Sequence, residues 1–515
     1  MFVVIALSLA LRMWHEVVYD DMYIDKLTQI ATAKNLVSGN GFTVGGFGSG
    51  DFTLMSNFFS VKYAPAYSLF IIPFYFITGN FHLAAVMMDI FFVLLLYLAL
   101  IKLFICLEIP YKKQMIFFAF LGISFTPMYH LTSSDLISLA IYQWAVYFSI
   151  YFLKIKTKYF GLGILSGFLL FLTGASRYSY YPMIFALPFS VFIIGKIKRD
   201  SVIKLFSVFS GVSACVFLLL QSIILKLLSG SAVRDLDETG FFLRNLLSMD
   251  VFPFKSLFFY EGLEKVLFAF HPLLKTAYIL VAAFFSAWVV IEIFRFIMRK
   301  TMPDSLHKDY LITGITVLMV NVFFLVFMSL THKGQDWKDP PWTFVEETRY
   351  YSQSMLFIAV AFLTFILFEQ YQKKTSKFIY KFLVFIVMFY AGAYWVNNII
   401  KISLDKKHEY TFRGMYKEKL NLCDIVSSNL TKDKPVVFVS PDNKMSYFVF
   451  AMTGIQAVNW NYNAVLNDSL IKNNGPINLF IATPHGTSNL KNLKKYSPEK
   501  IGELKTYDLY KTEIK

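Results

Sequence analysis

The chain contains 515 residues, of which 56% are hydrophobic and only 16% are charged, whereas an ordinary soluble domain has roughly 25% charged residues. This composition excludes a disordered chain and most soluble folds. Lys and Arg outnumber Asp and Glu by 49 to 34, which gives a formal net charge of +15. In a soluble chain this charge could indicate a nucleic-acid partner. In a chain with long apolar runs, the first explanation is that basic loops lie on one side of a membrane.

Apolar runs separated by polar breaks predict about eleven transmembrane helices. In chain order, the predicted spans cover residues 2–19, 83–107, 115–131, 136–153, 160–176, 180–195, 202–228, 276–294, 310–330, 352–368 and 378–399. A shorter apolar stretch at residues 64–78 contains Pro65 and Pro73, and we interpret it as a juxtamembrane or re-entrant segment. If it were a span, every later loop would change sides.

The basic residues of the loops decide between these two topologies. With the N-terminus inside, the short outer loops hold only Arg177, Lys333, Lys338 and Arg349. The cytoplasmic loops then hold Lys112, Lys113, Lys154, Lys156, Lys158, Lys196, Lys198, Arg199, Arg295, Arg299, Lys300, Lys308, Lys373, Lys374, Lys377 and Lys381. The positive-inside rule expects this asymmetry, so we favour the topology with the C-terminus outside.

Three regions face the outside in this topology: residues 20–82, residues 229–275 and the tail, residues 401–515. The tail has strand-like runs at residues 435–440, 447–451 and 477–482, separated by clusters of Asn, Gly, Pro and Lys. We therefore predict an all-α polytopic membrane domain, residues 1–400, followed by a small extracytoplasmic α/β domain, residues 401–515.

The first outer loop begins with two adjacent carboxylates, Asp20 and Asp21, followed by Tyr23. Apolar residues from Tyr23 to Val37 fall near helical spacing and predict an amphipathic helix along the membrane surface that ends at Gly39. The two carboxylates either cap the start of this helix or supply a general base where a span meets water.

Four segments of the chain resemble the GT-C membrane glycosyltransferases, the superfamily that includes protein O-mannosyltransferases and aminoarabinose transferases. Residues 20–23 (Asp-Asp-Met-Tyr) and 33–42 (Ala-Lys-Asn-Leu-Val-Ser-Gly-Asn-Gly-Phe) are similar to the family's first luminal loop. Residues 62–69 resemble its next element, an aromatic and Pro-rich stretch before a juxtamembrane helix. Residues 127–135 resemble the second outer loop, and residues 346–350 resemble a late outer loop with an Arg-Tyr pair.

The resemblance implies an inverting glycosyltransferase that moves a sugar from a polyprenyl-phosphate donor to a glycan, lipid or protein acceptor on the outer face of the membrane. A carboxylate would take the acceptor proton. Because the segment between Tyr23 and Ala33 is about one helical turn longer than the family pattern, this base stays open among Asp20, Asp21 and Asp25, with Asp21 or Asp20 favoured next to the first span.

Arg177 and Arg349 are the predicted ligands of the donor phosphate, since a planar guanidinium matches phosphate oxygens, and Lys62 is a predicted third contact to the same phosphate. The alternatives are a snorkelling role for Arg177, an ion pair with Glu346 for Arg349, and a flanking position for Lys62. The resemblance also implies substrate contacts for Asp135, Tyr63 and Tyr350, with helix capping as the alternative for Asp135.

No cofactor is required by the sequence. Some GT-C members hold a divalent cation near this site, but no ligand spacing here demands one, and Cys106, Cys215 and Cys423 lie too far apart for a zinc site or a disulfide framework. Richness in Phe, Ile, Lys and Asn suggests an AT-rich bacterial genome, which would place the protein in an inner membrane. The sugar, the carrier lipid and the acceptor stay open. A transporter or flippase of a lipid-linked saccharide is the second hypothesis, and a non-catalytic assembly protein is the third.

Overall fold

The computed structural model describes residues 2–18, 24–39, 41–44, 58–59, 64–123, 134–229, 240–248, 272–298, 306–333, 348–361, 363–364, 381, 385, 396, 417–430, 436–440, 443–453, 455–459, 477–485 and 497–514. Residue contacts divide the chain into two compact units. One comprises Met1–His15, Asp89–Lys226 and Ala232–Ile400, and the other comprises Glu16–Met88, Leu227–Ser231 and Lys401–Lys515. The first outer loop and the C-terminal tail therefore belong to the same unit.

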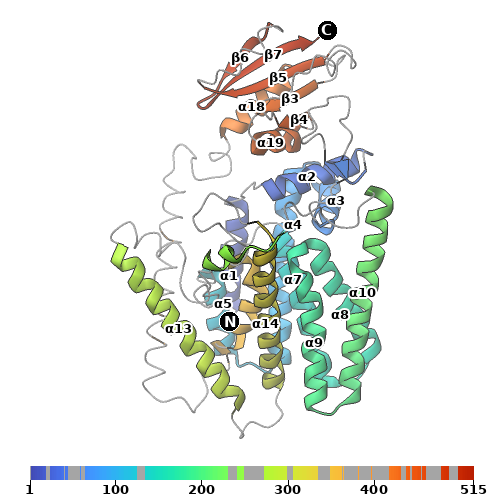
Figure 1. The fold of residues 1–515 in the computed structure, drawn as a ribbon, viewed down its shortest axis with the longest axis vertical. Helices are drawn as coiled ribbons and strands as arrows, with labels where there is room; N and C mark the ends of the chain where they lie inside the picture. The colour runs from blue at the N-terminus through green and yellow to red at the C-terminus, as the bar shows by residue number, and fades with distance from the viewer. Residues whose placement is uncertain are drawn as a thin grey trace. The chain divides into compact units, whose positions relative to one another are not determined.

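The first unit is a bundle of mainly apolar helices (Figure 1). Its elements, some of which extend past its bounds, are α1 (Phe2–Val18), α4 (Phe81–Cys106), α5 (Tyr111–Ile123), α7 (Ser134–Ile155), α8 (Tyr159–Ser176), η1 (Tyr178–Tyr180), α9 (Tyr181–Ile197), α10 (Ser201–Ser229), η2 (Leu243–Ser248), α13 (Pro272–Met298), α14 (Leu306–Thr331), η4 (Thr348–Tyr351) and α15 (Ser352–Ala361). Helices α7, α8, α9 and α14 pack side by side.

Six helices in the described part of the chain are long and apolar enough to cross a membrane. They are Phe81–Cys106, Ser134–Ile155, Tyr159–Ser176, Tyr178–Ile197, Ser201–Leu227 and Leu306–Thr331. The predicted membrane protein is thereby confirmed, whereas the predicted count of eleven spans stays a prediction. The stretch interpreted as juxtamembrane forms α3 (Ala66–Thr78), whose 13 residues measure about 20 Å and are too short for a hydrocarbon core of about 30 Å.

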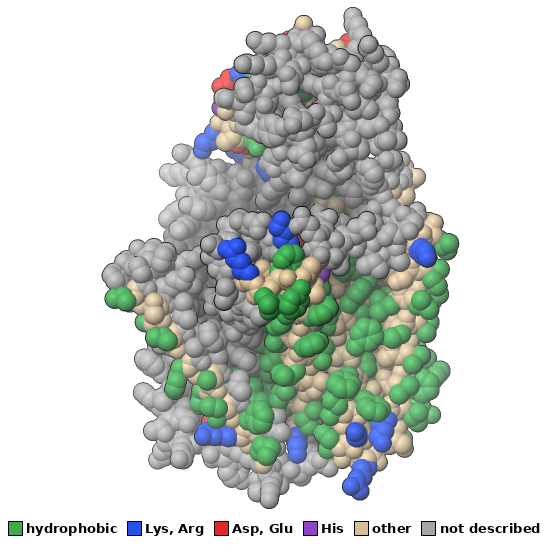
Figure 2. Space-filling model, in the orientation of Figure 1, with side chains coloured by type: hydrophobic (Ala, Val, Ile, Leu, Met, Phe, Trp, Pro, Cys, Tyr) green, Lys and Arg blue, Asp and Glu red, His purple; other side chains and the backbone are tan. Residues whose placement is uncertain are grey.

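Two tight turns close one end of the bundle. The α7–α8 turn and the α9–α10 turn place Lys156, Lys158 and Arg199 at positive φ, and an ion pair of 2.9 Å between Lys156 Nζ and Asp200 Oδ2 joins them. This lysine holds the pKa of Asp200 below its usual value. Figure 2 shows apolar side chains over the sides of these helices and Lys and Arg side chains at the end that carries the turns.

A buried arginine connects α1 to α5. Arg12 is 1% exposed, and its Nε and Nη2 atoms donate to the carbonyl of Leu121 at 3.1 and 2.7 Å. One turn earlier, Ser8 donates to the carbonyl of Phe118 at 2.6 Å. Leu121 lies in the last turn of α5, where carbonyls lack a partner within the helix, so Arg12 supplies a donor that hydrocarbon could not.

Small residues let α8 and α10 approach each other closely. A Cβ atom on Gly167 would lie 2.4 Å from the carbonyl oxygen of Ser210, and one on Gly163 would lie 3.0 Å from Cβ of Phe209. Between these glycines, the Ser166 hydroxyl lies 3.2 Å from that of Ser149 and 3.3 Å from that of Ser210. The spacing of four residues matches the small-xxx-small pattern of membrane helix contacts.

The second unit combines the first outer loop with the C-terminal tail. Its elements are α2 (Ile24–Val37), β1 (Thr43–Val44), β2 (Phe58–Phe59), α3, α18 (Lys417–Ser428), β3 (Val436–Ser440), α19 (Asn443–Thr453), β4 (Gln456–Asn459), β5 (Ile477–Pro484), β6 (Glu499–Glu503) and β7 (Tyr507–Ile514). The tail sheet has the order β4-β3-β5-β7-β6, in which β3 runs parallel to β4 and β5 while β7 runs antiparallel to β5 and β6. The small C-terminal α/β fold is thus present.

One predicted strand of the tail is wrong. Residues 447–451 lie in α19, not in a strand, because Met445, Phe448 and Val449 recur at helical spacing and are fully buried. The parallel pairing of β3 with β4 also requires a crossover between them, and α19 supplies it. The strands predicted at residues 435–440 and 477–482 correspond to β3 and β5.

Helix α2 is enclosed by other elements of the second unit. It packs against α3 on one side and α19 of the tail on another (Figure 1). Polar residues such as Lys26, Thr28 and Gln29 are as buried as Leu27 and Ile30. The predicted helix is therefore present and ends before Gly39, which has a φ of +80°, but it is buried on several faces instead of exposing one polar face to water.

Candidate functional site

The structure brings four of the predicted site residues together in the first unit: Asp135, Arg177, Arg349 and Tyr350. Each lies at a helix end. Asp135 is the second residue of α7, and Arg177 follows α8 in an extended conformation with φ −158° and ψ 124°. Arg349 and Tyr350 form the middle of η4, just before α15 begins. We name these four residues the arginine cluster.

The other predicted site residues do not belong to the arginine cluster as the structure describes it. Asp20, Asp21, Lys62 and Tyr63 lie outside the described residues. Asp25 lies in the first turn of α2, in the second compact unit.

Asp135 is the centre of the arginine cluster. Its side chain is 0% exposed, and its Oδ2 atom lies 3.0 Å from Arg177 Nη1 and 3.8 Å from Arg349 Nη1. The side chains of Arg177 and Arg349 are 14% and 23% exposed. A carboxylate buried this deeply needs an opposite charge nearby, and here two guanidinium groups provide it. The three side chains together carry one net positive charge.

Hydroxyl groups complete the surroundings of the ion pair. Tyr180, the last residue of η1, donates to Asp135 Oδ1 at 2.8 Å and lies 3.0 Å from the carbonyl oxygen of Arg349. Ser352 donates to the same carbonyl at 2.7 Å, and Ser134 accepts from Arg177 Nη1 at 3.1 Å. The carboxylate is thus directed at Tyr180 and the arginines, which favours an ion-pair role for Asp135 over helix capping.

Tyr350 lies against both guanidinium groups. The Cζ atoms of Arg177 and Arg349 are 5.5 and 5.2 Å from its ring centroid, within the range of a cation–π contact. Arg177 Nη2 also lies 3.4 Å from the Tyr350 hydroxyl. Asn321 of α14 donates to the Tyr350 carbonyl at 2.9 Å. Because Tyr350 is only 5% exposed, these contacts fix the two like charges next to each other.

Three residues of this region are not predicted from the sequence: Tyr180, Asn321 and Ser352. Tyr180 is one of 31 tyrosines and stands in a Tyr-rich segment, so its position gives no distinct signal. Asn321 and Ser352 are polar residues within or beside apolar runs, and such residues in membrane helices often mark functional sites. That criterion would have found both.

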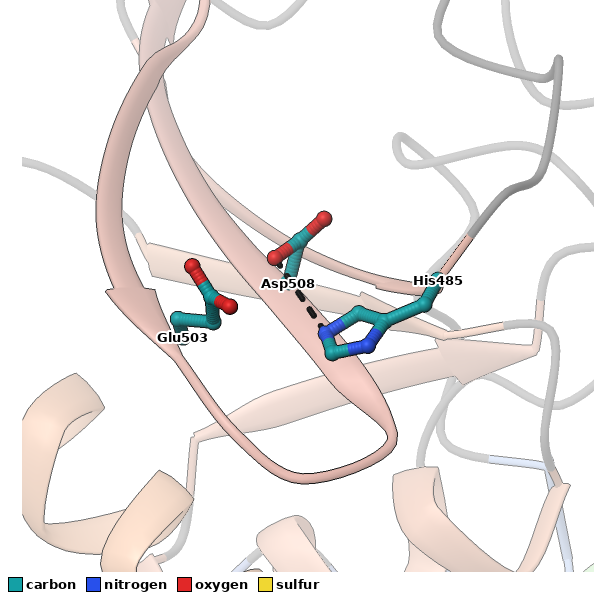
Figure 3. A group of neighbouring side chains, drawn as sticks. All are labelled: His485, Glu503 and Asp508. Carbon is teal, nitrogen blue, oxygen red and sulfur yellow. Dashed lines mark ion pairs between the residues drawn. The ribbon is translucent and has the colours of Figure 1, made fainter.

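A second group of titratable residues lies in the tail sheet (Figure 3). Among the described residues, His485, Glu503 and Asp508 lie close enough together to be considered as metal ligands. Lys500 Nζ, however, lies 2.8 Å from Asp508 and 2.6 Å from Glu503, and both carboxylates raise the pKa of this lysine. The ammonium group already supplies the positive charge that a cation would bring.

Comparison with known proteins rests on solved structures, because no family model and no curated protein matches the chain. The arabinofuranosyltransferase AftD from Mycobacteria aligns with 99% of this chain and 39% of its own at 10% identity, with a TM-score of 0.54. The fold of this chain is therefore similar to that of AftD, which is one of the GT-C glycosyltransferases. The fold that the resemblance implied is thereby confirmed.

Two further solved structures align along most of this chain. ArnT from Cupriavidus metallidurans bound to undecaprenyl phosphate covers 99% of this chain and 97% of its own at 10% identity, with a TM-score of 0.48. AglB from Archaeoglobus fulgidus, in complex with an inhibitory peptide and a dolichol-phosphate, covers 96% and 70% at 9% identity, with a TM-score of 0.46. At these identities the likeness concerns the fold and leaves the chemistry to the site.

The arginine cluster lies at the bundle end opposite the α7–α8 and α9–α10 turns, which we call the basic turns. Helix α8 separates them, since Lys158 precedes its first residue and Arg177 follows its last. Its 18 residues correspond to about 27 Å, close to the hydrocarbon thickness of a bilayer. The cluster and the turns are therefore separated by about one membrane.

Proposed function

We propose that the protein is an inverting glycosyltransferase that moves a sugar from a polyprenyl-phosphate donor to an acceptor hydroxyl or amine on the outer face of a membrane. The observation that carries the proposal is the arginine cluster: two guanidinium groups around one buried carboxylate, at the ends of apolar helices, in a chain with the GT-C fold. The placement of the cluster about one membrane thickness from the basic turns supports an outer site.

The charge of the arginine cluster suits the leaving group of this reaction. In the donor, the phosphate links the lipid to the anomeric carbon of the sugar and carries one negative charge. When the acceptor attacks the anomeric carbon, the bond from that carbon to the phosphate oxygen breaks, and the phosphate gains a second negative charge. A fixed net positive charge stabilises the later state more than the earlier one, and this difference accelerates the reaction.

The base, the other phosphate ligands and the substrate contacts are the residues predicted from the sequence. Asp21 or Asp20 takes the acceptor proton, so that the proton leaves as the new glycosidic bond forms. Arg349 and Arg177 bind the phosphate, with Lys62 as a third cation, while Tyr63 and Tyr350 line the substrate site. We also propose a catalytic membrane domain at residues 1–400 and an extracytoplasmic domain at residues 401–515. The protein would lie in a bacterial inner membrane and use a glycan, lipid or protein as the acceptor.

Removal of the gene tests the proposed reaction. We expect one surface glycan or glycolipid to lose a sugar in the deletion strain and to regain it when the wild-type gene is returned. Unchanged glycans and lipids would overturn the proposal. A flippase would also alter surface glycans, but only a transferase moves sugar from the donor to an acceptor in detergent, where no membrane separates two compartments.

Two variants test the catalytic base. Asp20→Asn and Asp21→Asn keep the size of the side chain and remove its ability to accept a proton at neutral pH. We expect one of them to abolish transfer at an unchanged membrane yield. Transfer retained by both variants would contradict the assignment of the base.

A further inference from the structure

The Tyr180 hydroxyl contacts two separate parts of the chain, α7 and the continuous segment formed by η4 and α15. It lies 2.8 Å from Asp135 Oδ1 on α7, 3.0 Å from the carbonyl oxygen of Arg349 in η4, and 3.4 Å from the hydroxyl of Ser352 at the start of α15. Tyr180 itself ends η1 and is fully buried. One atom thus contacts both the carboxylate and the backbone of one arginine in the cluster.

The number of available protons decides which of these contacts are hydrogen bonds donated by Tyr180. A phenol has one proton, and the short distance to the charged Asp135 Oδ1 favours donation to the carboxylate. The Arg349 carbonyl then receives its hydrogen bond from Ser352 at 2.7 Å. Tyr180 therefore engages Oδ1, while Oδ2 faces Arg177 and Arg349.

This division limits how strongly Asp135 can bind the two arginines. Without the phenol, Oδ1 would lose a buried donor, and the carboxylate would gain by turning both oxygens toward the guanidinium groups. A carboxylate that engages both arginines with both oxygens competes with a phosphate for the same N–H groups. When Tyr180 donates to Oδ1, only Oδ2 of Asp135 competes with a phosphate for the arginine N–H groups.

We infer that Tyr180 is a positioning residue, which orients Asp135 and the Arg349 backbone so that Arg177 and Arg349 are arranged in advance for the phosphate of a polyprenyl-phosphate ligand. The inference rests on the proposed function. Advance arrangement strengthens binding because the charged groups need not reorganise when the ligand arrives.

The test is the affinity of the purified full-length chain for a short-chain polyprenyl phosphate in detergent. Tyr180→Phe removes only the hydroxyl, and we expect it to weaken binding about tenfold or more. Tyr178→Phe is the matched control, because Tyr178 lies in the same 3-10 turn and its ring packs on Tyr181 at 5.4 Å. The control should bind the lipid as the wild type does.

A double variant separates positioning from a general loss of structure. If Tyr180 acts through the two arginines, Tyr180→Phe weakens binding by a smaller factor in the Arg349→Lys variant than in the wild type. Multiplied losses in the double variant would overturn the inference, as would wild-type affinity in Tyr180→Phe. Absence of binding by the wild type would instead overturn the proposed function, and this inference with it.

Ser352→Ala provides a second route if Tyr180→Phe does not fold. It leaves the Tyr180 hydroxyl to serve both the carboxylate and the Arg349 carbonyl, so binding should weaken by a smaller factor than a tenfold loss. Wild-type affinity in Ser352→Ala would contradict the proposed division of hydrogen bonds.

Discussion

Arg349 is the more exposed of the two arginines beside Asp135, so it is the one that we expect to reach a phosphate. Arg349→Lys keeps the charge but removes the planar fork of donors. We predict that kcat falls about a hundredfold, the usual effect of removing one donor to a developing negative charge. Steady-state transfer from a synthetic polyprenyl-phosphate sugar measures it.

The control for this substitution is Arg295→Lys. Arg295 also pairs with an acid, Glu292, at 2.8 Å, but both residues lie near the end of α13, away from the helix ends that form the arginine cluster. Its variant should transfer at the wild-type rate. An Arg349→Lys variant within threefold of the wild type would argue against phosphate binding by Arg349.

Cys423 gives a prediction about reactivity. Burial in α18 raises the pKa of its thiol from 9.0 to about 12. Because only the thiolate reacts, this rise lowers the reactive fraction at pH 8 about a thousandfold. Alkylation by iodoacetamide, followed by mass spectrometry, should therefore be about a thousand times slower in the native protein than in denaturant. Equal rates in both states would show that this thiol is accessible.

At the scale of elements, the glycines of α8 predict how tightly two helices pack. Gly167→Val would place side-chain atoms against the carbonyl of Ser210 and Cβ of Ser213, which lie 2.4 and 2.7 Å from the position that a Cβ atom would occupy. Overpacking of this kind costs about 1–3 kcal/mol. We expect a lower melting temperature in detergent. Gly161→Val is the control, since nothing lies within 4 Å of its Cβ position, and a similar loss there would point to helix propensity alone.

Lys34 predicts a pH dependence of stability in the second unit. Burial in α2 lowers its pKa below 10.5, so the folded state disfavours the charged form. Between the lowered pKa and 10.5, the unfolded chain binds more protons than the folded chain, and this contribution to stability therefore rises with pH. Lys34→Met should raise the melting temperature at pH 7, and its advantage should shrink as the pH approaches 10.5. A less stable variant at pH 7 would contradict this account.

The sequence predicts the helices better than the tail. Long apolar runs specify membrane helices through composition alone, and the ends of α8, α9 and α10 lie within a few residues of their predicted limits. The tail is harder because short apolar runs fit a strand and a buried helix equally well, as residues 447–451 show. Strands β6 and β7 escape prediction because charged residues, Gly and Thr separate their few apolar residues and leave no strong apolar pattern.

The site is only partly accessible to sequence reasoning. Charged residues such as Asp135, Arg177 and Arg349 are rare enough in an apolar chain to be selected one by one. Their mutual distances depend on how α7, α8 and η4 pack, which no local pattern encodes. The hydroxyl of Tyr180 matters only because of that packing, so it could be recognised only in three dimensions.

For the whole molecule, the basic turns predict its orientation in the membrane. A cysteine introduced at Ser229, in a chain lacking its three native cysteines, should react with a membrane-impermeant maleimide added to intact cells. One introduced at Lys158, in the turn between α7 and α8, should react only after the cells are opened. The reverse pattern would invert the topology and move the arginine cluster to the cytoplasmic side.

The buried Arg12 has a consequence for biogenesis. An arginine in the interior of a membrane helix disfavours insertion by about 2.5–3.5 kcal/mol when the helix is alone in lipid. In the folded protein, Arg12 donates two hydrogen bonds to the carbonyl of Leu121, which lies 109 residues further along the chain. If α1 crosses the membrane as the sequence predicts, we expect it to insert stably only after α5 has been synthesised.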